Sequence, residues 1–184
     1  MNDDTFIISE QDIQSAITKV ASKISSDYQN KPLLAICVLK GAVIFFSDLV
    51  RKLSTPVRFD FIAVSSYGAD TTSSGKITFR ARTHISDEEL KDYHILIVED
   101  IVDTGNTLYW LKDYFLSKNP LSVKVCTLID KPSRRVADIQ PDYCCFTIPD
   151  KFIVGYGLDC NEFYRELPYI ADIDYAKNTH KSLV

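Results

Sequence analysis

The sequence of 184 residues lacks a long apolar run and a dense run of basic residues. Its longest apolar region, from Leu33 to Phe46, is interrupted by Lys40 and Gly41 and is too short to span a bilayer. The acidic N-terminus lacks the basic-then-apolar layout of a signal peptide. The net charge of −4 and the scattered Lys and Arg disfavour nucleic-acid binding through a basic face. We therefore expect a cytoplasmic protein that binds neither membranes nor nucleic acid.

Histidine is scarce, and none of the three histidines stands in a Ser/His or Cys/His arrangement of the kind that forms a nucleophilic site. The cysteines, which are odd in number and not spaced as metal ligands, are Cys37, Cys126, Cys144, Cys145 and Cys160. We interpret them as reduced thiols of a cytosolic protein. No Walker A pattern or nucleophile elbow occurs, and Gly155-Tyr156-Gly157 lacks the third glycine of a dinucleotide fingerprint.

Length and composition, with 46% hydrophobic and 25% charged residues, favour one ordinary globular domain. Apolar and β-branched runs predict strands at residues 33–39, 57–65, 77–82, 95–98 and 123–129. Apolar residues at helical spacing predict helices over residues 10–28 and 42–53 and from about residue 108. We interpret residues 83–93 as a charged, solvated connection and the last third of the chain as rich in loops.

The most informative stretch is ILIVEDIVDTGNTL, residues 95–108. An apolar run typical of a strand buried on both faces is followed by Glu99, Asp100 and Asp103, and a hydroxyl-and-glycine loop then leads into a helix. Ligands of open α/β sheets bind beyond the carboxyl ends of the strands. Gly105 permits close approach of a ligand, and the unpaired N–H groups of the first helical turn suit a phosphate.

The acids of this stretch need a separate explanation, because carboxylates and phosphate repel one another. They indicate sugar hydroxyls, Mg²⁺ or a proton in transit, so the whole loop indicates a phosphorylated ribose. The alternative is a strand-to-helix turn whose acids serve only as caps. Capping does not require Glu99, Asp100 and Asp103 together.

Two further segments carry candidate ligand groups. Lys40-Gly41 follows a predicted strand, where it could approach an anion or form a plain turn, and the residues alone do not decide between these. The polar segment from Ser66 to Gly75 is either a lid over the site or the tip of a hairpin.

Residues 95–108 resemble the phosphoribosyl pyrophosphate (PRPP) binding motif of the type I phosphoribosyltransferases. With LKG, SSY, DKPSRR and IPDKFIVGYGLD, the chain from about residue 33 to 170 is similar to the bacterial-type hypoxanthine/guanine branch of that family. The resemblance implies an α/β fold, a twisted and mainly parallel sheet flanked by helices, with a small hood. It implies a single domain, residues 1–184, with a core at about 30–140 and a hood built from the N-terminal segment and about 141–184.

The same resemblance implies Mg²⁺-dependent transfer of the phosphoribosyl group of PRPP to hypoxanthine or guanine, giving IMP or GMP and pyrophosphate in purine salvage. Asp103 then moves the proton of the purine N7. The 5′-phosphate and ribose are assigned to Glu99, Asp100, Asp103, Thr104, Gly105, Asn106 and Thr107. Pyrophosphate is assigned to Lys40, Gly41 and Arg165, and a closing flap to Ser66 and Tyr67. The purine is assigned to Lys131, Phe152, Ile153 and Asp159, and Mg²⁺ to Asp159, Glu99 and Asp100.

Several of these assignments depend on the resemblance more than on the residues. Phe152 and Ile153 alone predict an apolar strand in the core. Lys131 ends a predicted strand on the edge that carries the acids, so it can reach them, whereas Arg134 and Arg135 are interpreted as surface or interface residues. The three donors of a lysine ammonium pair with a 6-oxo group and not with an amino group, which predicts use of 6-oxopurines and rejection of adenine.

Alternative functions remain open from the sequence. A xanthine-preferring enzyme is one, because backbone groups would read the purine 2-position. A non-catalytic PRPP-sensing regulator is another, although Asp103 and Lys131 are residues that a sensor need not keep. A nucleotide-binding module without turnover is the third. Family members are commonly dimers or tetramers, so we expect a homodimer or homotetramer. Cys160 stands where the branch usually has an aromatic residue.

Overall fold

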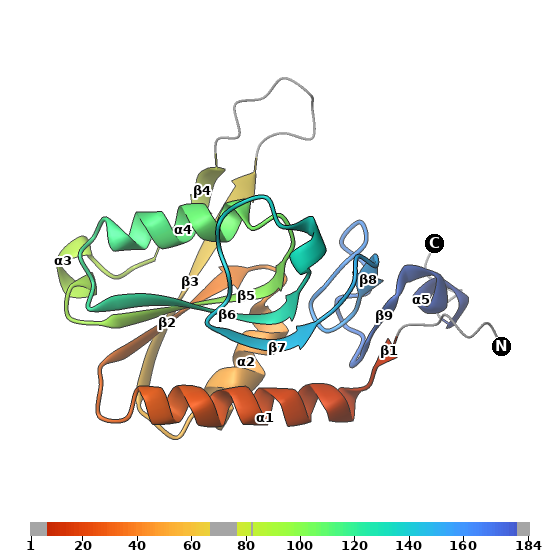
Figure 1. Ribbon diagram of the computed structural model, residues 1–184, viewed down its shortest axis with the longest axis horizontal. Helices are drawn as coiled ribbons and strands as arrows, with labels where there is room; N and C mark the ends of the chain where they lie inside the picture. Colours follow the sequence, from red (N-terminus) through yellow and green to blue (C-terminus); the bar gives the residue numbers. More distant parts are fainter. Residues whose placement is uncertain (1–6, 67–76, 82, 180–184) are drawn as a thin grey trace.

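The computed structural model describes residues 7–66, 77–81 and 83–179. A twisted sheet of six strands forms its centre, in the order β4-β3-β2-β5-β6-β7 (Figure 1). The strands are β2 (Leu33–Leu39), β3 (Val57–Ser66), β4 (Ile77–Ala81), β5 (His94–Val102), β6 (Ser122–Asp130) and β7 (Tyr143–Thr147). All neighbouring pairs are parallel except β3 and β4. The predicted α/β fold with a mainly parallel sheet is confirmed.

Helices cover both faces of this sheet. The helices α1 (Glu10–Asp27) and α2 (Val43–Lys52) lie on one face, and α4 (Asn106–Leu116) lies on the other (Figure 1). The first begins where expected, because the Ser9 side chain accepts a hydrogen bond from the N–H of Asp12. Its buried stripe of Ile13, Ile17 and Ile24 has the helical spacing seen in the sequence.

The β5 strand is buried on both faces, as its apolar run predicted. Leu96 and Val98 pack into the cluster beneath α1 and α2, whereas Ile95 and Ile97 pack into the cluster beneath α4. Because the side chains of a strand alternate between its faces, this one strand connects the two layers of core. The end of β5 is thereby held rigidly where the acids follow.

A second, smaller sheet joins the two ends of the described chain (Figure 1). Its antiparallel strands have the order β1-β9-β8 and the bounds Ile7–Ile8, Ile170–Asp172 and Ile153–Val154. The helix α5 (Ile173–Thr179) follows β9. The expected hood boundary near residue 141 lies before β7, which pairs with β6 in the larger sheet. Residues 143–147 therefore belong to the larger sheet.

Three local features differ from the sequence-based expectation. The supposed connection at 83–93 contains a short helix, α3 (Asp87–Leu90), because Ser86 and Glu89 form a reciprocal capping box. The helix α4 begins at Asn106, earlier than expected, and a 3₁₀ turn covers Pro132–Arg134. No helix within the described ranges is both long enough and apolar enough to cross a membrane.

Candidate active site at the carboxyl edge of the sheet

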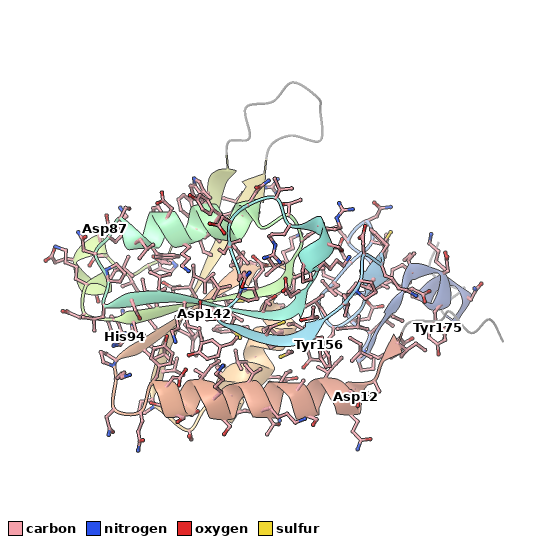
Figure 2. The ribbon with its side chains drawn as sticks, in the orientation of Figure 1. Asp12, Asp87, His94, Asp142, Tyr156 and Tyr175 are labelled. Carbon is pink, nitrogen blue, oxygen red and sulfur yellow. The ribbon has the colours of Figure 1, made fainter. Side chains whose placement is uncertain are left out.

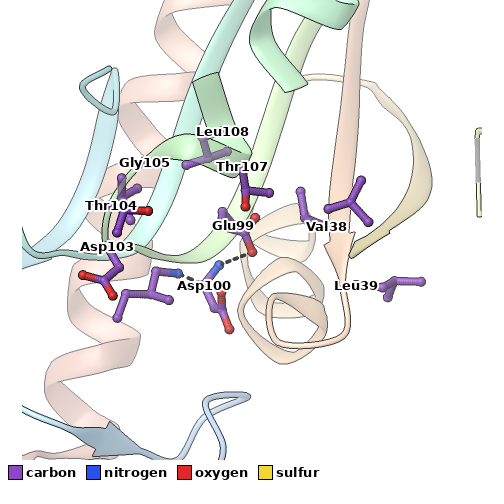
Figure 3. A pocket seen from close by; sticks show the side chains of 12 residues that line it. Val38, Leu39, Glu99, Asp100, Asp103, Thr104, Gly105, Thr107 and Leu108 are labelled. Carbon is purple, nitrogen blue, oxygen red and sulfur yellow. Dashed lines mark hydrogen bonds between the residues drawn. The ribbon is translucent and has the colours of Figure 1, made fainter. Parts of the chain in front are cut away.

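A cavity of about 290 Å³ opens where β2 and β5 end and α4 begins (Figure 3). It is lined by Val38, Leu39, Val64, Glu99, Asp100, Ile101, Val102, Asp103, Thr104, Gly105, Thr107 and Leu108. Most members of the predicted phosphate-and-ribose run therefore share one cavity, at the edge where ligands of such sheets bind. Asn106 is exposed at the first position of α4.

Glu99 and Asp100 form a crowded acidic pair in this cavity. Glu99 is only 9% exposed, and its Oε1 accepts a long hydrogen bond of 3.4 Å from the N–H of Asp100 (Figure 3). Burial, followed by the negative charge of Asp100, raises the pKa of Glu99 well above its ordinary value. Burial also raises the pKa of Asp100. A hard cation or an array of hydroxyl donors at this position would relieve both carboxylates.

The turn after β2 is packed against this pair. The peptide bond between Leu39 and Lys40 is cis. A Cβ on Gly41 would lie 1.7 Å from Oδ2 of Asp100, and a Cβ on Gly157 would lie 2.0 Å from the carbonyl oxygen of Gly41. Glycine is therefore required at both positions. The Lys40-Gly41 turn is held between Asp100 on one side and the backbone at Gly157 on the other.

The loop between β5 and α4 is held from outside by the segment that follows β6. The carbonyl of Thr104 accepts hydrogen bonds from the N–H groups of Val136 and Ala137, at 2.9 and 3.0 Å. Gly105 has a φ of +84° and provides no side-chain cap for α4. The first helical turn is thus available to an anion in a loop whose shape is already set.

Arg135 holds that loop in place through three contacts of its guanidinium group. Its Nε donates to the carbonyl of Asp103 at 3.1 Å, its Nη1 donates to the carbonyl of Ile139, and its Nη2 pairs with the carboxylate of Asp130. The side chains of Arg135 and Asp130 are 15% and 13% exposed. The sequence did not mark Arg135 for this role, since its partners, two backbone carbonyls and the carboxylate of Asp130, are identified only by the fold.

Asp103 faces a different arginine. Nε of Arg134 donates to Oδ1 of Asp103 at 2.7 Å, and Nη1 of the same guanidinium donates to Asp150 at 3.2 Å. Arg134 therefore links the β5–α4 loop to the segment before β8. The sequence analysis interpreted Arg134 as a surface or interface residue and did not single out Asp150.

Lys131 is buried at the end of β6. Its N–H donates to the carbonyl of Val102 at 2.9 Å, and its Nζ donates to the carbonyl of Lys151. Burial lowers the pKa of Lys131, while the negative charges of Asp103 and Asp150 act in the opposite direction. The ammonium is thus aligned beside the segment that carries Phe152 and Ile153.

Phe152 and Ile153 have opposite surroundings. Phe152 is 58% exposed, whereas Ile153 is buried in β8. The carbonyl of Phe152 accepts a hydrogen bond from the N–H of Ile173 at 3.1 Å. An exposed aromatic ring on an anchored backbone is suited to stacking on a flat ligand.

The loop after Gly157 carries the charged groups expected at pyrophosphate. Nη1 of Arg165 donates to the carbonyl of Gly157 at 2.7 Å, and Nη2 pairs with Asp159 at 2.9 Å. Nη2 and Lys40 both contact the carboxylate of Glu162, each at 3.2 Å. The structure therefore brings Lys40, Arg165 and Asp159 into one network, to which it adds Glu162.

Tyr156 fixes this loop to the helical layer (Figure 2). Its hydroxyl donates to the carboxylate of Asp48 on α2, and Gln14 on α1 donates to the same carboxylate at 2.8 Å. Tyr156 precedes Gly157, so its anchoring also fixes the contact between Gly157 and Gly41.

The predicted site residues thus fall into linked groups. Glu99 to Thr107 surround the cavity, Lys40, Asp159 and Arg165 form the charged network, and Lys131 lies beside Phe152 and Ile153. The predicted site residues that do not line the cavity itself are Lys40, Gly41, Asn106, Lys131, Phe152, Ile153, Asp159 and Arg165. Ser66 is the last residue of β3, and Tyr67 lies outside the described residues.

Known proteins resemble this chain over most of its length. The phosphoribosyl transferase domain model matches residues 7–161. A hypoxanthine-guanine phosphoribosyltransferase of Bacillus subtilis is 45% identical over 164 residues, 89% of each protein. Another, from Streptococcus pneumoniae, is 44% identical over 164 residues, which again are 89% of each protein. A solved hypoxanthine phosphoribosyltransferase of Staphylococcus aureus superposes with a TM-score of 0.86 at 39% identity, covering 92% of this chain and 90% of that one.

Proposed function

The chain belongs to the phosphoribosyl transferase family, and we propose from this premise that it is a purine-salvage enzyme that transfers the phosphoribosyl group of PRPP to hypoxanthine or guanine. The products are IMP or GMP and pyrophosphate. The supporting observation is one cavity that combines the buried Glu99 and its neighbour Asp100 with the start of α4, which has no side-chain cap. A phosphorylated sugar matches both parts of the cavity: its hydroxyls can donate to the two carboxylates, and its phosphate can accept from the N–H groups at the start of α4.

Asp103 is proposed as the proton acceptor. Its Oδ1 is held by Arg134, so the carboxylate is oriented while Oδ2 can accept from N7–H of a purine. N7 must lose its proton as the glycosidic bond forms, and a positioned general base contributes about 10²- to 10⁴-fold in rate. The charge of Glu99 and Asp100 favours the positive ribose that develops as the bond to pyrophosphate breaks.

Mg²⁺ is proposed as the cofactor, with Glu99, Asp100 and Asp159 as the residues that would hold it. Carboxylate oxygens are the donors that Mg²⁺ prefers, and the mutual repulsion of Glu99 and Asp100 favours a cation there. Across the described residues no three His, Cys, Asp or Glu side chains form a closed metal centre. The three carboxylates therefore do not form one closed site, and Mg²⁺ held by one or two of them would complete its shell with substrate phosphates. When bound, Mg²⁺ would neutralise part of the charge of pyrophosphate.

The purine is proposed to lie against Phe152, with its 6-oxo group at Lys131 and its 2-position near the backbone of Ile153. The burial of Lys131 supports this, because a buried ammonium has three donors and the carbonyl of Lys151 accepts from one of them. Lys40, Gly41 and Arg165 are proposed to bind pyrophosphate. The flap that we expect at Ser66 and Tyr67 stays a prediction.

We propose further that the protein self-associates as a homodimer or homotetramer. Phe59 and Phe61 on β3 are 51% and 36% exposed and touch Phe46 of α2, next to Val43, which is 42% exposed. An exposed aromatic cluster of this kind favours contact with another protein surface.

A cytoplasmic location and a single domain, hood included, are proposed too. The five free cysteines support the first, and apolar residues of both sheets in one core cluster support the second.

The test is a substrate panel. Purified protein is mixed with Mg²⁺, PRPP and each of hypoxanthine, guanine, xanthine and adenine, and nucleotide formation is followed by absorbance. We expect turnover of hypoxanthine or guanine and rejection of adenine. Faster turnover of xanthine would make this a xanthine enzyme, and PRPP binding without any turnover would make it a sensor. Adenine turnover comparable to that of hypoxanthine would contradict the role of Lys131.

A further inference from the structure

Glu162 occupies the space between the two cations proposed to bind pyrophosphate. Its Oε2 lies 3.2 Å from Nζ of Lys40 and 3.2 Å from Nη2 of Arg165. We propose that the Glu162 carboxylate is a built-in competitor of pyrophosphate: it neutralises Lys40 and Arg165 in the empty enzyme, is displaced when PRPP binds, and returns as pyrophosphate leaves. The proposal deepens the proposed function and rests on it.

The backbone around Glu162 supports a specific role for this side chain. Cys160 and Phe163 exchange two backbone hydrogen bonds of 3.1 Å, which closes a two-residue turn at Asn161-Glu162. Both residues of that turn have positive φ, +52° and +70°. Such a turn favours Asn followed by Gly, so a glutamate at its second position is held in a conformation that glycine would adopt at no cost. The shape of the turn therefore does not by itself account for a glutamate at position 162.

The network would survive the departure of Glu162. Arg165 keeps the carbonyl of Gly157 at 2.7 Å and the carboxylate of Asp159 at 2.9 Å. The turn keeps the hydrogen bond from the N–H of Glu162 to Oδ2 of Asp159, at 2.9 Å. Only the carboxylate of Glu162 therefore has to move to free Lys40 and one face of Arg165.

The contacts of Glu162 are weak enough to be displaced. The side chains of Lys40 and Glu162 are 68% and 63% exposed, so water and salt screen their attraction. Pyrophosphate carries several negative charges and can contact Lys40 and Arg165 at once, and so it outcompetes a single carboxylate.

The experiment compares Glu162→Gln with the wild type and with Glu166→Gln, a control at an exposed acid of the same segment. Three constants are measured: the KM for PRPP, the KM for hypoxanthine, and the inhibition constant of pyrophosphate. Glu162→Gln removes the charge but keeps the length of the side chain. We expect it to lower the KM for PRPP and the inhibition constant of pyrophosphate by about 2- to 5-fold, the scale of an exposed ion pair. The KM for hypoxanthine and all constants of Glu166→Gln stay unchanged.

A second variant separates charge from folding. Glu162→Gly removes the same charge and relaxes the turn, so it should show the same two decreases with an equal or higher melting temperature. Unchanged or raised constants for PRPP and pyrophosphate in both variants would overturn the proposal. Titration calorimetry of pyrophosphate with Mg²⁺ gives a readout without turnover. A wild type that binds pyrophosphate but forms no nucleotide would therefore refute the proposed function and still decide the role of Glu162.

Discussion

Gly41 and Asp100 touch without room for a single methyl group, since a Cβ on Gly41 would lie 1.7 Å from Oδ2 of Asp100. Through this contact the turn after β2 and the acids after β5 set each other's positions. Gly41→Ala should therefore displace the Asp100 carboxylate and destabilise the fold by about 1–3 kcal/mol, the usual cost of overpacking. We expect a large loss of kcat/KM for PRPP in initial-rate measurements. Thermal unfolding measures the loss of stability. Ser47→Ala, on the exposed face of α2, is the control, and full PRPP use by Gly41→Ala would refute the contact.

Arg135 should contribute more to stability than its neighbour Arg134. Arg135→Ala leaves the partly buried carboxylate of Asp130 unpaired and frees the carbonyl of Asp103, at an expected cost of about 2–4 kcal/mol, somewhat below that of breaking a fully buried pair. Arg134 is 46% exposed, and Arg134→Ala should cost less than about 1 kcal/mol. Urea unfolding measures both. Arg135→Lys should rescue little, because one ammonium cannot replace the planar fork of a guanidinium. Equal losses in the two alanine variants would contradict this ranking.

The buried Glu99 predicts a pH-dependent stability. Because its folded-state pKa is raised, the native protein holds this proton more tightly than the unfolded chain. The stability associated with Glu99 is thus present below its ordinary pKa of 4.5 and is lost as the pH rises toward the folded-state value. Glu99→Gln cannot ionise, so its melting temperature relative to wild type should increase from pH 4 to pH 8, in buffer without divalent cations. If the difference in melting temperature between Glu99→Gln and the wild type stays constant from pH 4 to pH 8, then ionisation of Glu99 does not destabilise the fold.

Substitution of Lys131 should change the KM for the purine and not the KM for PRPP. Lys131→Met keeps most of the buried volume but removes the donor, and a hydrogen bond to a charged group contributes about 1.5–3 kcal/mol. We expect the KM for hypoxanthine to rise roughly 10- to 100-fold with an unchanged KM for PRPP. Lys52→Met, at the exposed end of α2, should change neither. Initial rates over both substrates distinguish these outcomes, and unchanged hypoxanthine kinetics would exclude Lys131 from the purine site.

Local patterns predicted the elements that carry the site. The apolar run before Glu99 is buried on both faces because the parallel sheet has helices on each side, and that burial is visible in the sequence alone. Position 41 was identified as a glycine at a strand end, although only the fold shows that Asp100 is what fills its missing side chain. The short helix at Asp87–Leu90 could have been found from Ser86 and Glu89, three residues apart.

Long-range pairs are what the sequence could not reveal. Arg134 and Asp103 are 31 positions apart, and nothing near either residue marks the other as a partner. Lys40 and Glu162 meet across 122 positions because the smaller sheet folds the chain back over the edge of the larger one. A charged side chain has no apolar periodicity to place it, so its partner depends on the complete topology. The same holds for β7, whose five residues become a strand only by pairing with β6.

The most direct test of the account is the rate of IMP formation from PRPP and hypoxanthine by Asp103→Asn. The exposed pair with Arg134 contributes little to folding, so the melting temperature should stay near that of the wild type. Asp150→Asn, the other acid bound by Arg134, is the control that should retain its rate. We expect a fall of about 10²- to 10⁴-fold in kcat for Asp103→Asn. A wild-type kcat in that variant would contradict it.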